Sequence, residues 1–248
     1  LGFAMRRTFA DLHLCTNINE SSQRKNLIKK ASVLGYRLIS IPLAYTSADQ
    51  EVKRVRSECE DVNLDFASRV DLTPRSPEEL LRDLRKVRRR FEIVAVMCYS
   101  KAVARQAAKD RRVDLLNFPQ PDFRRAFFDR AEAELASTCL SSFEIDVKPL
   151  LCFEGPVRTR LLAILQGEVK IAKAHDVPIV VSSGVSEPLL MRRPTELAAV
   201  GALFGLQGEV ARKSVSGNPV AIVKRNREKL SWRFVAPGIR VVRRGKGC

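Results

Sequence analysis

Histidine is scarce in this sequence, and its cysteines lack the spacing that metal sites require. Only two histidines are present, His13 and His175, and the six cysteines form no CxxC pair and no short Cys/His cluster. Structural zinc sites need four such ligands at close spacing, which argues against a zinc finger or ribbon. We expect reduced thiols, several of them buried in strands, and a cytoplasmic location, or a nuclear and nucleolar one if the source is eukaryotic.

Long apolar runs are also missing. The longest, Ile93–Tyr99, is the size of a strand and falls far short of the ~20 residues of a membrane-spanning helix. The first residues lack the apolar core and small-residue cleavage site of a secretory signal. With 248 residues, 45% hydrophobic and 29% charged, the composition excludes a disordered chain and predicts a soluble protein with one core.

Acidic residues are in the minority, and the basic excess is unevenly distributed. Lysine and arginine number 44 against 28 aspartates and glutamates, a net charge of +16, and 30 of the 44 are arginine. Residues 81–112 carry a net +8 and residues 207–248 a net +9, whereas residues 113–156 carry −4. Because lysine and arginine release counterions from phosphates, two basic regions on a nearly neutral body favour a nucleic-acid partner over mere surface solubility.

Short β-branched or apolar runs alternate with amphipathic helical stretches along the chain. The expected strands are Thr8–Leu14, Arg37–Leu43, Leu64–Asp71, Glu92–Tyr99, Val113–Phe118, Ser142–Leu150 and Pro178–Ser182. Their starts lie 21 to 36 residues apart, which is the length of a βαβ unit with its crossover helix. Seven such units favour a closed (β/α) barrel over an open sheet, as a single domain over 1–231 followed by a basic tail, 232–248.

Two basic helices can be placed from their capping residues. In the first, Ser76 is the expected N-cap, Pro77 the first helical residue and Glu79 the partner in a capping box. Its apolar stripe is Leu80, Leu84, Val87 and Phe91, and its arginines at 82, 85, 88, 89 and 90 fall off that stripe.

The second helix lies near the C-terminus. Asn218 is its expected N-cap and Pro219 its first residue. Its apolar residues Ile222, Val223 and Leu230 are expected to face the body, and Lys224, Arg225, Arg227 and Lys229 to crowd the other side.

The first expected strand ends in FADLHLCT, and strand alternation would place Asp11 and His13 on one side of it. The run resembles the opening motif of the polymerase-and-histidinol-phosphatase (PHP) superfamily, D-L-H-x-H-T, with Cys15 where the second metal-binding histidine belongs. Those enzymes hold two or three metal ions with many His and Asp ligands, so the resemblance implies a degraded metal site. His175 is expected at a helix C-terminus, where its charge would complement the helix dipole.

Other catalytic patterns are weak. Ser182, Ser183 and Gly184 follow the seventh strand, where barrels often build a phosphate-binding turn, but no nucleophile elbow, Walker loop or dinucleotide fingerprint accompanies them. Glu144 and Asp146 share one strand face and are expected to be hydrogen-bonded barrel residues. We therefore expect no catalytic constellation and no metal in the chain itself.

The last third carries a family resemblance. PIVVSSGVSEPLLMRRPTELAAVGALFGL (178–206) and RKSVSGNPVAIVKRN (212–226) are similar to the ribonuclease P protein component 3 family, the archaeal and eukaryotic 30 kDa subunit. The segments FADLHL, VLGY (33–36), VDLLNFP (113–119) and FEIDVKPLL (143–151) match in order and spacing. The resemblance spans about Thr8 to Arg227.

The resemblance implies a PHP-like (β/α) barrel that has lost its metal site. It implies an RNA-binding subunit of ribonuclease P, in which the RNA performs the Mg²⁺-dependent endonucleolytic removal of the 5′ leader from pre-tRNA. The expected partners are the ribonuclease P RNA, a small RRM-like protein subunit, other small protein subunits and, for the holoenzyme, pre-tRNA. No cofactor is expected in the protein, because the Mg²⁺ belongs to the RNA.

The RNA-contacting residues are inferred from charge alone. They are Arg88, Arg89, Arg90, Arg105, Arg111, Arg112, Arg192, Arg212, Lys213, Lys224, Arg225, Arg227 and Lys229. Arg192 could instead bridge to a barrel carboxylate such as Asp11 or Glu144. The C-terminal basic helix could instead dock the small protein subunit.

Two other functions are alternatives to the role of a ribonuclease P subunit. One is a stand-alone PHP-type phosphoesterase, and the other is a basic barrel protein of ribosome or DNA metabolism.

Overall fold

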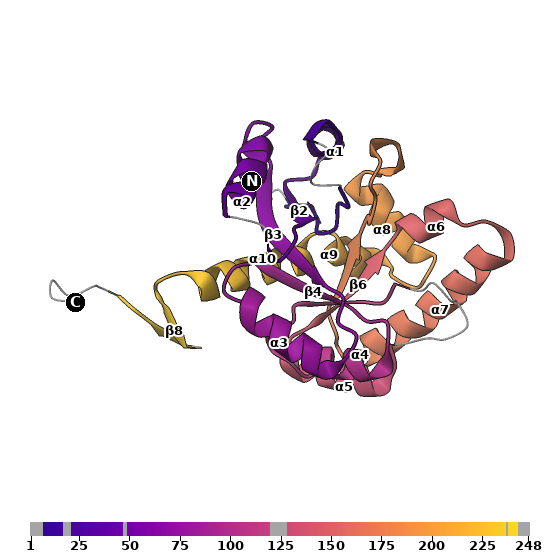
Figure 1. The fold of residues 1–248 in the computed structure, drawn as a ribbon. Coiled ribbons are helices and arrows are strands. Elements are labelled where there is room, and N and C mark those ends of the chain that lie inside the picture. The colour runs from indigo at the N-terminus through magenta and orange to yellow at the C-terminus, as the bar shows by residue number, and fades with distance from the viewer. Residues whose placement is uncertain (1–6, 17–20, 47–48, 120–127, 237, 243–248) are drawn as a thin grey trace, which may run out of the picture.

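The computed structural model describes residues 7–16, 21–46, 49–119, 128–236 and 238–242. Seven parallel strands lie side by side in chain order, with helices packed around them (Figure 1). The strands are β1 Ala10–Asp11, β2 Leu38–Pro42, β3 Asp65–Leu72, β4 Ile93–Met97, β5 Leu115–Asn117, β6 Ser142–Asp146 and β7 Ile179–Ser182. Each overlaps one expected strand, so the βαβ spacing is confirmed.

The helices of the described chain cover the outside of the sheet. They are α1 Ser21–Leu34, α2 Asp49–Glu60, α3 Pro77–Val87, α4 Lys101–Ala108, α5 Arg130–Cys139, α6 Lys148–Cys152, α7 Gly155–Ala174, the 3-10 turn η1 Pro188–Leu190, α8 Pro194–Ala202, α9 Gly208–Ser214 and α10 Gly217–Leu230. Several expected boundaries are wrong by a few residues, and two strands end well before their expected last residue. The first ends at Asp11 instead of Leu14. The sixth strand ends at Asp146 instead of continuing to Leu150, because Pro149 belongs to the first turn of α6. His175 is the C-cap of α7, as expected.

The sheet comes close to closing on itself where the chain continues beyond β1 and β7. Leu14 forms a parallel bridge with Val185. The N–H of Gly184 donates to the carbonyl of His13 at 2.9 Å. The architecture is therefore a TIM-like (β/α) barrel, as the strand spacing predicts.

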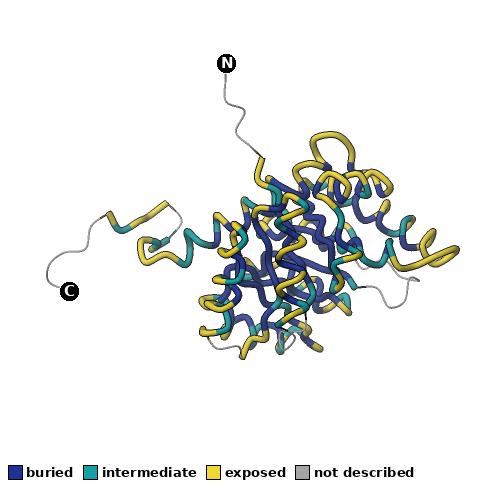
Figure 2. The backbone as a smooth tube through the Cα atoms, turned by 90° about the horizontal axis from the view of Figure 1, so that it is seen from above, coloured by how far each residue is buried: buried dark blue, intermediate teal, exposed yellow. Residues whose placement is uncertain are grey.

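The core has two layers. The larger cluster of buried apolar residues fills the space between the strands and the surrounding helices. A second cluster lies inside the barrel and consists of Ala10, Leu12, Leu38, Ala67, Ile93, Ala95, Met97, Leu115, Val180, Ile222 and Val223. Figure 2 shows the buried segments gathered at the centre, with exposed turns around them. Strand residues therefore alternate between the two clusters, as expected for a strand buried on both faces.

Helix α10 closes one end of the barrel. Ile222 and Val223 are buried and belong to the cluster inside the barrel. The helix begins at Gly217 after Ser216, so Asn218 is not its N-cap. The Asn218 side chain instead donates through Nδ2 to the carbonyl of Ile179 at 2.8 Å, which attaches the helix to the first residue of β7.

Helix α3 begins as expected in most respects. Ser76 is the N-cap, its side chain accepts from the N–H of Glu79, and Pro77 opens the helix. The capping box is not formed, because the Glu79 carboxylate accepts from the N–H of Arg75 at 2.7 Å instead. The expected apolar stripe is fully buried, at Leu80, Leu84, Val87 and Phe91.

The start of the basic tail forms a small hairpin. Strand β8 Phe234–Ala236 pairs in antiparallel fashion with β9 Ile239–Arg240. The hairpin extends from the end of α10 away from the barrel (Figure 1). Residues 243–248 of the expected tail lie outside the described residues. Within the described residues, no helix has the length and apolar character needed to cross a membrane.

Candidate functional site

Polar side chains gather inside the barrel at the C-terminal ends of the strands. They are Arg69 and Asp71 of β3, Asn117 of β5, Glu144 and Asp146 of β6, Ser182 of β7, and His13 just beyond β1. Residues two apart in a strand point to the same face, which brings the paired members inward together. This is the end of a barrel at which active sites form.

Arg69 lies at the centre of this cluster with its side chain fully buried. Its Nη1 and Nη2 donate to the two carboxylate oxygens of Glu144 at 2.6 and 2.7 Å, and its Nε donates to Asp71 at 2.6 Å. Nη1 also donates to the carbonyl of Leu12 at 2.7 Å. Burial lowers the pKa of Arg69, but the Asp71 and Glu144 carboxylates outweigh burial and raise the pKa above its ordinary value. The guanidinium is therefore a permanent buried cation held by a bidentate pair.

Glu144 is saturated by its neighbours. Besides the Arg69 fork, it accepts from Asn117 Nδ2 at 3.0 Å and from the Ser182 hydroxyl at 2.8 Å. Asn117 also donates to Asp146 at 2.9 Å. The expectation that Glu144 and Asp146 are hydrogen-bonded barrel residues is confirmed.

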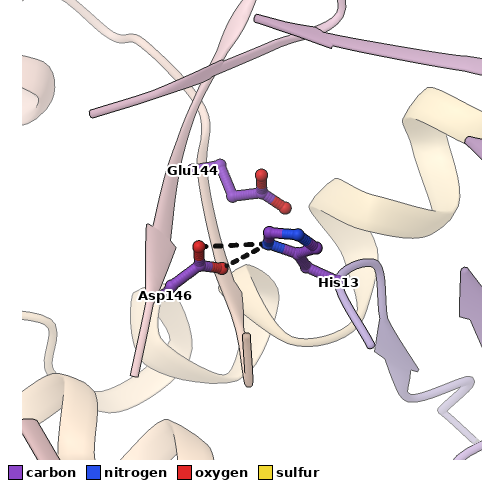
Figure 3. Close-up of side chains that lie close together, drawn as sticks. All are labelled: His13, Glu144 and Asp146. Carbon is purple, nitrogen blue, oxygen red and sulfur yellow. Dashed lines mark hydrogen bonds and ion pairs between the residues drawn. The ribbon is translucent and has the colours of Figure 1, made fainter. Parts of the chain in front are cut away.

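The His13 ring binds the Asp146 carboxylate through one nitrogen (Figure 3), and its other nitrogen faces the carboxylate of Asp71. Its Nδ1 is 2.9 and 3.0 Å from the two oxygens of Asp146, and its Nε2 is 3.1 Å from Asp71 and 3.2 Å from the Cys15 sulfur. Burial and the Arg69 charge oppose protonation of the ring, but Asp146 and Asp71 outweigh them and raise the pKa of His13 well above its usual value. Burial raises the pKa of Asp71, but Arg69 and His13 reverse this effect and bring it to about 2. The ring is thus held as a cation between two anions.

Three residues of the cluster could in principle ligate a metal. One atom each of His13, Glu144 and Asp146 lies within 4.8 Å of the others. In this arrangement both Glu144 oxygens accept from Arg69, and Asp146 binds His13 and Asn117. A divalent ion would have to displace a guanidinium and a protonated imidazole. The donor set therefore does not fit a metal, and Arg69 supplies the positive charge that a metal would bring.

The side chains of Asp11 and His13 point in different directions, contrary to the expectation that both point to one side of a strand. Asp11 pairs in register with Ile39, whose side chain is in the outer core, while its neighbours Ala10 and Leu12 face the barrel interior. The alternation does not reach His13, because β1 ends at Asp11.

The Asp11 carboxylate is bound by backbone groups. Its Oδ1 accepts from the N–H groups of Ser183 at 3.0 Å and His13 at 3.2 Å, while Oδ2 is buried without a hydrogen-bond partner in the described chain. Burial raises the pKa of Asp11 to about 6, against the lowering effect of the Ser183 hydrogen bonds. Ser182 and Ser183 thus bind carboxylates of the barrel itself, which leaves no open phosphate-binding turn at this position.

The two basic regions meet at the opposite end of the barrel, around the N-terminal ends of the strands. Arg88 follows α3 and Arg225 lies in α10, and both bind Asp114 just before β5, at 2.8 and 3.1 Å. Arg227 binds Asp65, the first residue of β3, through two hydrogen bonds of 2.6 and 2.8 Å. It also binds Glu92, just before β4, at 2.5 Å.

These ion pairs correct part of the charge-based expectation. Arg225 and Arg227 do not simply crowd the solvent side of α10, and Arg88 does not simply face water or a ligand. Their guanidinium groups attach α10 and the end of α3 to carboxylates at the strand starts. The physical reason is that Asp114 and Glu92 are buried carboxylates, which need a positive partner near the barrel end, whereas Asp65 is exposed.

The other expected RNA-contacting residues divide into two groups. Those with a carboxylate partner are Arg105 with Glu132 at 3.3 Å, Arg112 with Asp110 at 2.6 Å and Arg212 with Glu209 at 3.9 Å. Within the described residues, no ion pair is found for Arg89, Arg111, Lys213, Lys224 or Lys229, all of them exposed except the half-buried Lys229. Arg90 donates to the carbonyl of Tyr45 at 2.8 Å.

Arg192 lies just before α8. Its Nη1 donates to the carbonyls of Leu189 and Met191, each at 3.1 Å. The alternative of a bridge to Asp11 or Glu144 is therefore wrong, because the side chain turns back onto its own loop.

Sequence reasoning missed the central residue of the cluster. Arg69, Asp71 and Asn117 were not predicted from the sequence as residues of a site. Two of them, Arg69 and Asp71, lie two residues apart in the run ASRVDL, which is otherwise composed of small or apolar residues. Charged residues in a buried strand are rarely tolerated without partners, and this signal could have identified them.

Known proteins resemble the whole barrel. The sequence model of the family "RNase P subunit p30" matches residues 8–231. Two curated relatives are called Ribonuclease P protein component 3. The one from Methanosarcina barkeri is 27% identical over 89% of this chain and 92% of its own length. The one from Methanosarcina mazei is 30% identical over 70% of this chain and 71% of its own.

A solved structure shares the fold. A chain in the cryo-EM structure of archaeal Ribonuclease P with mature tRNA superposes with a TM-score of 0.83 at 21% identity. The match covers 95% of the present chain and 99% of that chain.

Proposed function

This chain belongs to the RNase P subunit p30 family, and from that premise we propose that it is a non-catalytic, RNA-binding subunit of ribonuclease P. As a member of this family, the chain acts in tRNA processing as part of an endoribonuclease. Its reaction is the removal of the 5′ leader from pre-tRNA, with the RNA supplying the Mg²⁺-dependent chemistry and the barrel supporting that RNA.

The observation that carries the non-catalytic role is the position of Arg69. Metal-assisted hydrolysis of a phosphodiester needs a cation with an open coordination position and an activated water. Arg69 instead fills the centre of the cluster, and four of its five N–H donors are bound by Glu144, Asp71 and a backbone carbonyl. A guanidinium locked in this way neutralises the carboxylates but cannot activate water. No cofactor is therefore assigned to the protein, and the Mg²⁺ is assigned to the RNA.

RNA is expected at the end of the barrel closed by α10. Here the two basic regions converge, and Arg89, Arg111, Lys213 and Lys224 are exposed. Phosphate contacts fix position without reading sequence, which suits recognition of a structured RNA by its backbone. The small RRM-like subunit and the other protein subunits are expected on the remaining surface.

The residues in and beside the polar cluster do not favour the competing function, a stand-alone phosphoesterase. A cavity of about 280 Å³ adjoins Asp146, with walls that include Phe118, Phe143 and Leu161. Its lining among the described residues contains no arginine or lysine that could hold a phosphate. A phosphoesterase pocket would combine such cations with a metal.

Reconstitution tests the proposal. Full-length chain is mixed with ribonuclease P RNA, the other subunits and a 5′-labelled pre-tRNA, and leader release is compared with and without the chain. We expect the chain to bind the RNA and to increase cleavage, and the chain alone to hydrolyse neither pre-tRNA nor a simple phosphodiester with Mn²⁺ or Zn²⁺. Metal-dependent turnover by the chain alone would refute the proposal, as would failure to bind the RNA.

A further inference from the structure

A cavity of about 470 Å³ lies at the α10 end of the barrel, between α5, α10 and the β8–β9 hairpin. We call it the closed-end cavity. Its walls include the side chains of Arg111, Leu140, Arg225, Lys229, Phe234 and Arg240. It is on the opposite end of the barrel from the Arg69 cluster, and its volume suits one nucleotide.

Positive charge exceeds negative charge around the closed-end cavity, because Glu228, the acidic residue of its described lining, is already paired with Arg240. Arg88 and Arg225 share the single carboxylate of Asp114, and no ion pair joins Arg111 or Lys229 to a carboxylate within the described chain. Arg225 Nε at the cavity wall is buried and has no hydrogen-bond partner among the described residues, and the same holds for Nη2 of Arg88, which does not line the cavity itself. Buried N–H donors without acceptors are costly, so an anion arriving at this place would complete a set of bonds that the protein leaves open.

The same crowding affects the pKa of Lys229. Partial burial, followed by the charges of Arg225, Arg88 and Arg111, lowers its pKa below the ordinary value. An ammonium group in such a position gains more from a phosphate than a solvated surface lysine does, because the phosphate also relieves repulsion among the neighbouring cations.

An apolar wall faces these cations. Leu140 follows α5 with φ of +63°, and its side chain is 59% exposed. A left-handed conformation is unfavourable for leucine by about 1 kcal/mol, and glycine or asparagine normally takes that place. The Leu140 carbonyl accepts from Arg225 Nη1 at 3.0 Å, so the strained residue is fixed to the cationic group. Phe234 of the hairpin is half-buried and lines the same cavity.

We propose that the closed-end cavity binds one unpaired nucleotide of an RNA strand. Its phosphate lies among Arg111, Arg225 and Lys229, and its base or ribose lies against Leu140 and Phe234. The proposal rests on the proposed function, because it names the part of an RNA that this end of the barrel takes. Aromatic and aliphatic surfaces bind unstacked bases without sequence preference, whereas paired bases in a duplex present only their backbone.

The test uses the full-length chain and a fluorescent 5′-phosphorylated pentauridylate. The first variant is Arg111→Gln with Lys229→Gln, which removes two positive charges at the cavity and breaks none of the ion pairs of the described chain. Its control is Lys29→Gln with Lys30→Gln, which removes the same charge from exposed positions of α1. The second variant is Leu140→Gly, which removes the apolar side chain and relieves the backbone strain, so the fold should not suffer.

We expect the Arg111/Lys229 variant to bind the pentauridylate at least tenfold more weakly than wild type, with the log–log salt slope reduced by roughly 1.5 units for two lost phosphate contacts. The α1 control should match wild type. Leu140→Gly should weaken binding several-fold while its melting temperature stays equal or rises. Inorganic phosphate should compete only at far higher concentration, and an RNA duplex of equal charge should bind more weakly than the single strand.

Three results would overturn the proposal: equal loss in the α1 control, no effect of Leu140→Gly, or duplex binding as tight as single-strand binding. The last two would mean a site for the backbone phosphate alone. Failure of this proposal is distinguishable from failure of the proposed function. A chain that binds ribonuclease P RNA and supports cleavage, yet shows any of these three results, keeps its role as a subunit and loses only the nucleotide site.

Discussion

Replacing the buried arginine at the barrel centre should be severely destabilising. Arg69→Met keeps a similar volume but removes four hydrogen bonds and the only guanidinium that binds Glu144 and Asp71 within the described residues. Glu144 is fully buried and cannot recover its hydration, and the Asp71 side chain, 17% exposed, can recover only part of it. Removing one partner of a buried ion pair costs about 3–5 kcal/mol, against roughly 5–15 kcal/mol for a whole domain. We therefore expect the variant to lose about a fifth of its stability or more.

Urea unfolding followed by circular dichroism measures this loss, with three variants in parallel. Arg69→Lys keeps the charge but not the fork and should fall between wild type and Arg69→Met. Arg69→Ala opens space beside His13, Glu144 and Asp146, so Mn²⁺ should raise its melting temperature while leaving wild type unchanged. If Arg69→Met lost less than about 1 kcal/mol, or if Mn²⁺ stabilised wild type and Arg69→Ala alike, the guanidinium could not be the built-in cation of this site.

Three further predictions concern other contacts. Arg227→Gln should lower the free energy of unfolding by about 2–3 kcal/mol, because it releases α10 from two carboxylates, and hydrogen exchange should show the loss in α10 first. Gly184→Ala should cost at least about 1 kcal/mol, since φ is +64° and a Cβ would lie 2.8 Å from the Cβ of Asp146; unchanged melting would refute the close approach. Glu58→Gln removes the carboxylate charge that binds buried Arg24 through two hydrogen bonds, and it should cost about 3 kcal/mol at pH 7. Arg24 lowers the pKa of Glu58 in the fold, so the advantage of wild type should shrink as the pH falls below about 4.5 in urea titrations; a pH-independent difference would contradict it.

The strands could be predicted from the sequence because each strand is buried on both faces. Runs such as Ile93–Tyr99 are continuously apolar, and their spacing leaves room for one crossover helix. Strand ends were less predictable. In Ser142–Leu150 polar and apolar residues alternate as far as Lys148, yet the strand ends at Asp146, where the chain must leave the barrel to start α6.

A degraded metal site was an expectation from the sequence, based on two histidines and on Cys15. The ion pairs of Arg69 were not expected. Arg69 and Glu144 are 75 residues apart, and only barrel closure brings their side chains within 2.6 Å. No local sequence pattern indicates which of the 30 arginine side chains points into the barrel. That depends on which face of β3 the residue lies on and on which strand carries its carboxylate partner.

The sequence by itself determined the charge, the βαβ repeat, the apolar faces of the helices and the family. The tertiary structure alone decided how the charges are used. Residues 81–112 and 207–248 read as two separate basic regions, but α10 lies across the strand starts and joins them at Asp114. Arg225 and Arg227 become structural there, while Arg111 and Lys229 remain without carboxylates in the described chain. The physical reason is that a charge takes its role from the groups within a few ångströms of it, and those neighbours come from distant parts of the chain.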